Sequence, residues 1–254
     1  MDIRLDGRIA LITGATGGIG SAIATEFFKS GATVIINGRT QEKIDALTDK
    51  LLTGGDKKDA ARIGGIAMDL TALDSETNMI QRVVEKYNKL DILVNNAAQI
   101  DGRLIMRCDP DYVSRLMLIN YRKPYQLTRN ALVHMRKNKY GRIINITSVS
   151  GQYGDSGLSA YAGSKAALHA LTQSISAEYG RYNITANSIA PGIVDTETAL
   201  KTISDEYKQN AKKLIPNHRF AKPSEIADLA TFLASERAAY INGQQIAING
   251  GLYR

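Results

Sequence analysis

Short apolar runs alternate with segments of helical periodicity along almost the whole chain. Seven short runs predict strands, and the run 33–36, which is β-branched and fully apolar, has the composition of a strand buried on both faces. These runs cover residues 8–12, 33–36, 62–68, 91–94, 142–146, 184–189 and 245–248. Repeated strand–helix units predict parallel strands joined by right-handed crossovers. We therefore expect one doubly wound α/β domain over residues 1–254, with a central, mostly parallel seven-stranded sheet flanked by helices.

Apolar residues recur at helical spacing between these runs. The spacing predicts helices over about 19–28, 75–87, 110–137, 159–179 and 223–234, with a more polar helix beginning near residue 40. Pro124 lies inside the long third segment and predicts a kink or a division there. Residues 201–213 are polar and predict a mobile segment, and the charged stretch 53–59 predicts a solvated loop.

The composition is that of an ordinary globular protein, with 254 residues of which 44% are apolar and 22% charged. This excludes a disordered chain, a collagen-like repeat and a disulfide scaffold. The single cysteine, Cys108, cannot pair within the chain, and no run of about 18 apolar residues is present. We therefore expect a cytoplasmic protein without a membrane span. The net charge of +7 suits acidic or phosphorylated partners, but solubility is the simpler explanation, and no motif indicates nucleic-acid binding.

A glycine-rich segment, Thr-Gly-Ala-Thr-Gly-Gly-Ile-Gly at residues 13–20, follows the first predicted strand and opens the first helix. Glycines permit a tight turn and let backbone N–H groups approach a pyrophosphate at the helix N-terminus. A glycine-rich turn without a ligand is the alternative, but the strand–loop–helix context is the one that dinucleotide binding requires. The expected cofactor contacts in this loop are Gly14, Thr16, Gly18, Ile19 and Gly20.

The spacing Thr-Gly-x-x-x-Gly-Ile-Gly resembles the fingerprint of the short-chain dehydrogenase/reductase family, and later motifs extend the resemblance over essentially the whole chain. The resemblance implies a Rossmann fold and a nicotinamide cofactor. Gly38 stands where NAD-preferring relatives carry an acidic residue, and the guanidinium of Arg39 beside it suits a 2′-phosphate. This favours NADP(H), although Gly17 stands where NADP-using relatives often have a second basic residue, so NAD(H) stays open. Asp69 and Leu70 resemble the family's contact with the adenine edge.

Four residues form the predicted catalytic set. Tyr161 and Lys165 lie one helical turn apart on the same face of a predicted helix. A nearby ammonium and a cationic nicotinamide would stabilise a phenolate, so Tyr161 is expected to donate a proton to a carbonyl oxygen. The resemblance adds Ser148, 13 positions before Tyr161 (161 − 148), to orient the carbonyl, and Asn120 to hold a water near Lys165. Each residue alone would be a cap, turn or surface residue, but the four in this order predict catalysis.

Two further segments resemble cofactor-binding motifs of the family. Asn-Asn-Ala-Ala at residues 95–98 is similar to the family's Asn-Asn-Ala-Gly and departs from it at the last position. Pro-Gly-Ile-Val-Asp-Thr at residues 191–196 is similar to the segment that holds the nicotinamide carboxamide. The resemblance implies cofactor contacts from these segments and from the catalytic helix, at Asn96, Ala97, Tyr161, Lys165, Pro191, Gly192, Val194 and Thr196.

Other reactive side chains lack the neighbours that chemistry would need. Tyr153 has Gly157 in place of a lysine four residues on, and Ser150 lies two residues beyond the family's serine position. Neither is assigned a catalytic role. The three histidines show no metal-ligand spacing with one another or with the cysteine, so no metal site is expected.

The resemblance is strongest to 3-oxoacyl-[acyl-carrier-protein] reductases, in segments 102–107, 215–227 and 240–251. It implies NADPH-dependent reduction of a 3-oxoacyl thioester, on acyl carrier protein or coenzyme A, to the 3-hydroxyacyl form in fatty-acid synthesis. It also implies a homotetramer and docking of the acidic carrier near the mouth of the site, at Lys139 and at Arg181 beside Tyr182. We expect a substrate lid over about 196–216. A short-chain dehydrogenase acting on another alcohol, ketone or sugar, and a catalytically silent nucleotide-binding protein, remain open.

Overall fold

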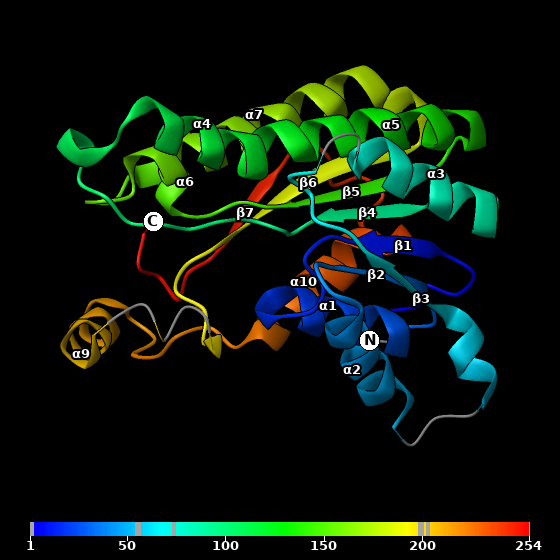
Figure 1. Ribbon diagram of the computed structural model, residues 1–254, viewed down its shortest axis with the longest axis horizontal. Coiled ribbons are helices and arrows are strands. Elements are labelled where there is room, and N and C mark those ends of the chain that lie inside the picture. The colour runs from blue at the N-terminus through cyan, green and yellow to red at the C-terminus, as the bar shows by residue number, and fades with distance from the viewer. Residues whose placement is uncertain (1–2, 54–56, 73–74, 198–200, 202–203, 254) are drawn as a thin grey trace.

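Seven parallel strands form one continuous sheet (Figure 1). The computed structural model describes residues 3–53, 57–72, 75–197, 201 and 204–253. The strands are β1 (Ile9–Ile12), β2 (Thr33–Gly38), β3 (Ile63–Ala67), β4 (Ile92–Asn95), β5 (Gly141–Ile146), β6 (Ile184–Pro191) and β7 (Gln245–Ile248). Their order is β3-β2-β1-β4-β5-β6-β7, and each neighbouring pair is parallel. The predicted doubly wound sheet is confirmed, and it is parallel across all the described strands.

The strand order reverses between β1 and β4, which are neighbours in the sheet. In a doubly wound fold, ligands bind in the crevice outside the carboxyl ends of the strands at such a reversal. The glycine-rich loop follows β1 and the Asn-Asn-Ala-Ala segment begins at the end of β4. The topology therefore brings these two predicted motifs to the same crevice.

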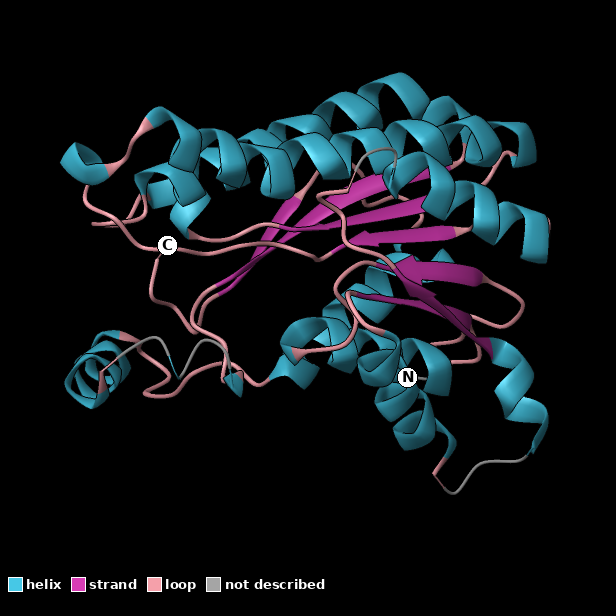
Figure 2. Ribbon diagram, in the orientation of Figure 1, coloured by secondary structure: helices cyan, strands magenta, loops and turns pink. Residues whose placement is uncertain are grey.

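Helices cover both faces of the sheet (Figure 2). One face carries α1 (Gly18–Lys29), α2 (Gln41–Leu52) and α10 (Pro223–Ala234). The other face carries α3 (Ser75–Tyr87), α4 (Pro110–Met117), α5 (Lys123–Asn138) and α7 (Ser159–Tyr179). The short α6 (Ser150–Tyr153) and α9 (Asp205–Leu214) lie at the same end of the molecule as the C-terminal end of the chain.

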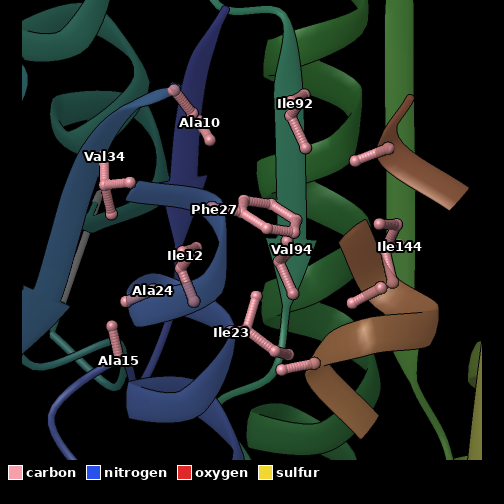
Figure 3. Packing of buried hydrophobic residues seen from close by; sticks show 14 of the residues in the cluster. Ala10, Ile12, Ala15, Ile23, Ala24, Phe27, Val34, Ile92, Val94 and Ile144 are labelled. Atoms are coloured by element: carbon pink, nitrogen blue, oxygen red, sulfur yellow. The ribbon is translucent and has the colours of Figure 1, made fainter. Parts of the chain in front are cut away.

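Each face of the sheet has its own apolar core. On the α1 side, Ile23 and Phe27 project from the helix toward Ile12 and Val94 of the sheet (Figure 3), and all four side chains are fully buried. Burying one such side chain contributes about 1.5–3 kcal/mol relative to leaving it exposed. This packing fixes α1 against β1 and β4, so the glycine-rich loop is held at both of its ends.

The long helical segment predicted over 110–137 is two helices separated by a π-helical turn. The turn spans Leu118–Arg122 and carries Asn120, which is fully buried. Pro124 follows this turn almost directly, and the backbone of Met117, Leu118, Arg122 and Lys123 is helical. A proline lacks the N–H that would bond to the carbonyl four residues earlier, here that of Asn120 in the π-helical turn. The predicted division is therefore confirmed, and it lies in the turn just before Pro124. π-helical turns inside α-helices occur frequently at functional sites.

The polar segment predicted to be mobile contains α9. This helix begins after Ser204, whose Oγ accepts a hydrogen bond from the Tyr207 N–H at 3.2 Å. Asp205 and Glu206 lie in its first turn, where the helix dipole favours negative charge. Residues 198–200 and 202–203 of the predicted lid, and 54–56 of the predicted charged loop, lie outside the described residues. Among the helices that the structure describes, none combines the length and the apolar character that crossing a membrane requires.

Candidate active site

The glycine-rich loop after β1 approaches its neighbours too closely for side chains. Gly14 has a φ of 61°, and a Cβ there would lie 3.0 Å from the Cα of Ala97. A Cβ on Gly20 would lie only 2.3 Å from the carbonyl oxygen of Gly14. Glycine is needed at both positions, because the loop folds back on itself and against the end of β4.

The N-terminus of α1 is open to an anion. Its N-cap residue is Gly17, which has no side chain to cap the helix, and no acidic residue lies in the first turn. A Cβ on Gly17 would have no atom within 4 Å, so the space over the loop is open. The first N–H groups of a helix have no partners within the helix, and the helix dipole favours negative charge there. These features fit the pyrophosphate of a dinucleotide.

Asn96 and Thr13 fasten the loop to β4. The Asn96 Nδ2 donates to the carbonyl oxygens of Thr13 at 2.9 Å and Gly14 at 3.1 Å. The backbone N–H groups of Asn96 and Ala97 donate to Thr13 Oγ1 at 3.0 and 3.1 Å. Asn96 and Ala97 therefore lie under the loop and shape it. Sequence reasoning missed Thr13, although its place directly before the first glycine was an available signal.

Two other predicted contacts, Ile19 and Leu70, are chiefly packing residues. Ile19 is half-buried against the core on the α1 side of the sheet. Leu70 is buried within the core on the opposite side. The Leu70 side chain therefore supports the end of β3. Leu70 would contact a cofactor mainly through its backbone.

At the tip of β2, Gly38 packs against Thr16 and is followed by Arg39. A Cβ on Gly38 would lie 2.4 Å from Thr16 Cγ2, so the Thr16 side chain occupies the space next to this glycine. Arg39 follows and is exposed. The pKa of Asp69 is lowered, first by hydrogen bonds from the Thr71 backbone N–H and hydroxyl and further by the positive charge of Arg39. Arg39 and Asp69 thus lie near each other at the end of the crevice where an adenosine would lie.

Three of the four predicted catalytic residues lie together beyond the carboxyl end of β5. The buried Lys165 Nζ donates to the carbonyl oxygen of Ile146 at 2.7 Å and lies 5.8 Å from the centroid of the Tyr161 ring. The side chain of Ser148 is hydrogen-bonded to the Tyr161 hydroxyl. Ser148 comes from the end of β5, whereas Tyr161 and Lys165 come from α7, which packs against β5 and β6.

Burial shifts the pKa values of the two titratable groups in opposite directions. Desolvation raises the pKa of Tyr161 to about 12, opposed by the hydrogen bond from Ser148 and assisted by the negative charge of Asp155. Desolvation lowers the pKa of Lys165 to about 7. Tyr161 is therefore held as a neutral phenol that can donate a proton, and Lys165 can exchange a proton near neutral pH.

The Asn120 side chain ties the segment after β4 to the catalytic helix. Its Oδ1 accepts from the Gln99 N–H at 2.8 Å, and its Nδ2 donates to the Gln99 carbonyl at 2.9 Å and to Ser164 Oγ at 3.0 Å. Ser164 directly precedes Lys165 on α7. Asn120 thus fixes the position of the helix turn that carries the lysine. Its predicted hold on a water stays a prediction.

The segment predicted to hold a carboxamide crosses the crevice after β6. Pro191 ends this strand, and the Gly192 N–H donates to β7 at 2.8 Å. Val194 is buried and forms an isolated bridge with the chain that follows α9. A Cβ on Gly18 would lie 3.1 Å from Thr196 Cγ2, so Thr196 packs against the glycine-rich loop. The segment therefore faces that loop at the mouth of the crevice.

Residues that sequence reasoning set aside or missed also belong to this region. Ser150 donates its backbone N–H to Ser148 Oγ at 3.2 Å and its hydroxyl to the Asp155 carboxylate. Tyr253, near the C-terminus, donates its hydroxyl to the other Asp155 oxygen at 3.0 Å. Its ring stacks on that of Tyr153, with centroids 4.4 Å apart and planes inclined by 14°. Asp155 and Tyr253 are 98 positions apart, and no motif spacing signals this contact.

Lys139 and Arg181 do not border the active site of their own chain. Lys139 is the C-cap of α5 and precedes β5, and Arg181 lies in the turn before β6. Ser148 comes after β5, and in a parallel sheet the residues before the strands and the residues after them lie at opposite edges. A strand of the 6 residues in β5 spans roughly 20 Å. The expectation that these cations lie near the mouth is therefore wrong for a single chain.

The histidines are placed for packing and turns. The His169 Nδ1 lies 3.3 Å from Ser188 Oγ, and desolvation lowers the His169 pKa. His218 is exposed, with a φ of 53°, in the turn after α9. Within the described part of the chain, no group of three or more His, Cys, Asp or Glu side chains is placed to hold a metal ion.

Comparison with known proteins places this site in a family. A family model described as enoyl-(acyl carrier protein) reductase matches residues 14–253. The chain is 35% identical over 253 residues to the 3-oxoacyl-[acyl-carrier-protein] reductase FabG of Aquifex aeolicus, with 100% of both chains covered. It is 39% identical over 250 residues to that of Rickettsia bellii, with 98% of both covered. The chain belongs to the short-chain dehydrogenase/reductase family.

Solved structures of the short-chain dehydrogenase/reductase family share this fold over the full length. A candidate gluconate dehydrogenase from Agrobacterium tumefaciens has a TM-score of 0.93 and 28% identity, covering 99% of this chain and 98% of that one. A candidate short-chain alcohol dehydrogenase from Sinorhizobium meliloti has a TM-score of 0.92 and 30% identity, with the same coverage. The protein is thus an oxidoreductase of a family that uses NAD(P)(H). The names of these relatives span several carbonyl and alcohol substrates, so family membership establishes the reaction class alone.

Proposed function

We propose that this protein reduces a 3-oxoacyl thioester to the 3-hydroxyacyl form with NADPH, as a step of fatty-acid synthesis in the cytoplasm. The cluster of Ser148, Tyr161 and Lys165 at the crevice carries the proposal of carbonyl reduction. Full-length similarity to proteins named 3-oxoacyl-[acyl-carrier-protein] reductases supports the thioester, carried on acyl carrier protein or on coenzyme A.

Each catalytic side chain has a role that its geometry supports. Bound NADPH would supply a hydride to the carbonyl carbon of the substrate. Tyr161, kept protonated by its raised pKa, would donate its phenolic proton to the carbonyl oxygen. The Ser148 hydroxyl would hydrogen-bond the same oxygen as negative charge develops on it. The Lys165 ammonium would stabilise the phenolate, and a pKa of about 7 lets this group pass a proton on at neutral pH.

NADP(H) is the proposed cofactor, with NAD(H) as the alternative. The tip of β2 carries no carboxylate, and the exposed guanidinium of Arg39 is suited to a 2′-phosphate. The open N-terminus of α1 fits the pyrophosphate. The residues proposed to line the cofactor are Gly14, Thr16, Gly18, Ile19, Gly20, Arg39, Asp69, Leu70, Asn96, Ala97, Tyr161, Lys165, Pro191, Gly192, Val194 and Thr196.

The proposed homotetramer bears directly on how a carrier protein would dock. Lys139 and Arg181 lie at the amino ends of β5 and β6, away from the catalytic residues of the same chain. An acidic carrier bound there would therefore serve the active site of a second subunit. Light scattering that gives the mass of a monomer would refute both the tetramer and this mode of docking.

The test is an initial-rate comparison of NADPH and NADH with an acetoacetyl thioester, carried on acyl carrier protein and on coenzyme A. We expect NADPH to be preferred and the carrier-bound thioester to react faster. Tyr161→Phe removes the donated proton and should lower kcat by about 10²- to 10⁴-fold while NADPH still binds. Tyr240→Phe, at a fully exposed tyrosine, is the matched control. A wild-type rate in Tyr161→Phe would refute the proposed role of Tyr161 as proton donor. If neither thioester is turned over, the assignment of a 3-oxoacyl thioester as substrate is refuted.

A second candidate substrate is a polyhydroxylated carbonyl compound or the matching alcohol. The observation that favours it is the Asp155 carboxylate, whose negative charge acts on Tyr161 and which accepts a hydrogen bond from Tyr253 of the stacked tyrosine pair. Carboxylates accept hydrogen bonds from hydroxyl groups, and aromatic faces pack against apolar faces of sugars. Turnover of sugar acids or polyols, in the absence of thioester turnover, would select this candidate. Binding of NADPH without turnover of thioesters, sugar acids or polyols would indicate a catalytically silent nucleotide-binding protein.

A further inference from the structure

A continuous chain of hydrogen bonds connects the C-terminal tail with the catalytic tyrosine. The Tyr253 hydroxyl donates to Asp155 Oδ1 at 3.0 Å, and the Ser150 hydroxyl donates to Asp155 Oδ2. The Ser150 N–H then donates to Ser148 Oγ at 3.2 Å. The chain ends with the hydrogen bond between Ser148 and Tyr161. Asp155 is its centre, because both carboxylate oxygens accept a hydrogen bond within it.

The direction of these bonds decides what the Ser148 hydroxyl can do. A serine hydroxyl has one proton to donate and two lone pairs that accept. The Ser150 N–H occupies one lone pair of Ser148 Oγ. The Ser148 proton and the second lone pair are left for the Tyr161 hydroxyl and a substrate oxygen. This arrangement depends on the position of Ser150, which Asp155 holds through the Ser150 hydroxyl.

The tail is held against the loop after β5 by a second, independent contact. The Tyr253 ring stacks on Tyr153 of α6, at a centroid distance of 4.4 Å. The Tyr253 carbonyl accepts from Asn249 Nδ2 at 2.9 Å, which turns the tail back after β7. Figure 1 shows the C-terminal end of the chain beside α6. Stacked aromatic rings stabilise their contact beyond burial alone, and this ring contact is retained when only the Tyr253 hydroxyl is removed.

We propose that Asp155 is a positioning residue for the Ser148–Tyr161 pair, and that Tyr253 makes the C-terminal tail part of the active site. The inference rests on the proposed role of Tyr161 as proton donor, and it holds for any carbonyl substrate. Lys165 faces Tyr161 from the same helix, Ser148 faces it from the end of β5, and Asp155 acts on it from the loop after α6. The negative charge of Asp155 raises the pKa of Tyr161, which helps to keep the phenol protonated.

The role of Tyr253 in positioning Asp155, and through it Ser148 and Tyr161, is tested with Tyr253→Phe. This substitution keeps the stacked ring and removes the hydroxyl that donates to Asp155. With acetoacetyl coenzyme A and NADPH as the probe, kcat should fall about fivefold, the effect of losing one hydrogen bond, with an unchanged KM for NADPH. Tyr240→Phe makes the same chemical change at a fully exposed site and should keep the wild-type kcat. A wild-type kcat in Tyr253→Phe would overturn the role of the tail.

The electrostatic effect is tested with Asp155→Asn by a measurement that needs no substrate. Carbon-13 NMR of labelled tyrosine, with saturating NADP⁺, follows the ionisation of Tyr161, whose resonance is identified by its loss in Tyr161→Phe. Removing the negative charge makes ionisation easier, so the midpoint should fall by roughly half a pH unit. Asp49→Asn, on the exposed face of α2, should leave it unchanged.

An unmoved Tyr161 midpoint in Asp155→Asn would overturn the role of Asp155. This outcome is distinct from failure of the proposed function, which a fully active Tyr161→Phe would reveal in the same series. If acetoacetyl coenzyme A is not turned over, the thioester assignment fails, while the NMR midpoint still decides the role of Asp155.

Discussion

Replacing Lys165 by methionine should abolish activity and yet make the cofactor-free protein more stable. Lys165 is 2% exposed, and desolvation lowers its pKa from an ordinary 10.5 to about 7. The folded protein therefore binds this proton less tightly than the unfolded chain does, which destabilises the folded state wherever the unfolded chain is protonated. Methionine fills a similar volume without a charge, so it removes that penalty.

The magnitude follows from the two pKa values. The lowered pKa corresponds to a penalty of at most about 4 kcal/mol at pH 7 and about 2 kcal/mol at pH 9, because the penalty fades as pH rises toward the pKa of the unfolded chain. Against this, the Ile146 carbonyl loses the hydrogen bond that Lys165 donates at 2.7 Å. An unsatisfied buried acceptor costs about 1–3 kcal/mol. The net gain at pH 7 is then about 2 kcal/mol, which corresponds to a Tm higher by about 4–8 °C.

Urea unfolding of the cofactor-free wild type and of Lys165→Met, at pH 7 and at pH 9, measures this gain directly. The difference in the free energy of unfolding should favour the variant at pH 7 and shrink at pH 9. Lys50→Met, on the exposed surface of α2, is the matched control and should change the free energy of unfolding little at either pH. A Lys165→Met protein less stable than the wild type at pH 7, or a difference that grows with pH, would refute the reasoning.

Three further substitutions test other parts of the site. Gly20→Ala places a Cβ 2.3 Å from the Gly14 carbonyl and should weaken NADPH binding about tenfold by calorimetry, whereas Gly163→Ala, exposed on α7 with no atom within 4 Å of the new Cβ, should stay within about twofold. Arg39→Ala should raise the Kd for NADPH about tenfold, the effect of a lost charged hydrogen bond, and leave the Kd for NADH unchanged. Lys139→Glu should raise KM for acetoacetyl-acyl carrier protein several-fold but not KM for acetoacetyl coenzyme A, and an equal rise in both would contradict carrier docking.

Several regular elements could be predicted closely from the sequence. The helices over 75–87, 159–179 and 223–234 and the strand over 245–248 have the predicted bounds. The π-helical turn Leu118–Arg122 could not be predicted, because a change from α- to π-helical hydrogen bonding leaves the apolar pattern of the segment almost unaltered. Pro124 predicted the change in the right region, because a proline disturbs the hydrogen bonds of the turn that precedes it.

The candidate site was predictable where it depends on local order along the chain. Tyr161 and Lys165 sit one turn apart on α7, and the glycine-rich loop lies between a strand and a helix. The contact between Asp155 and Tyr253 joins segments far apart in the chain, and neither residue type is distinctive in its local context. The place of Lys139 follows from the sheet alone. A residue before a parallel strand lies at the opposite end of the sheet from a residue after it, so Lys139 lies away from Ser148 of the same chain.

The two halves of the site are built by different means, which explains why the cofactor is easier to infer than the substrate. The cofactor half consists of backbone N–H groups at the start of α1 and of glycines whose positions admit no side chain. Such features can be recognised in the sequence as a glycine-rich segment between a strand and a helix. The part of the site beyond β5 is bordered by side chains of the loop after β5 and by the C-terminal tail. These segments can change without altering the sheet, and relatives that superpose with TM-scores of 0.92–0.93 bear the names of different dehydrogenases. The shared fold therefore does not determine the substrate, which the rate comparison of thioesters with polyols decides.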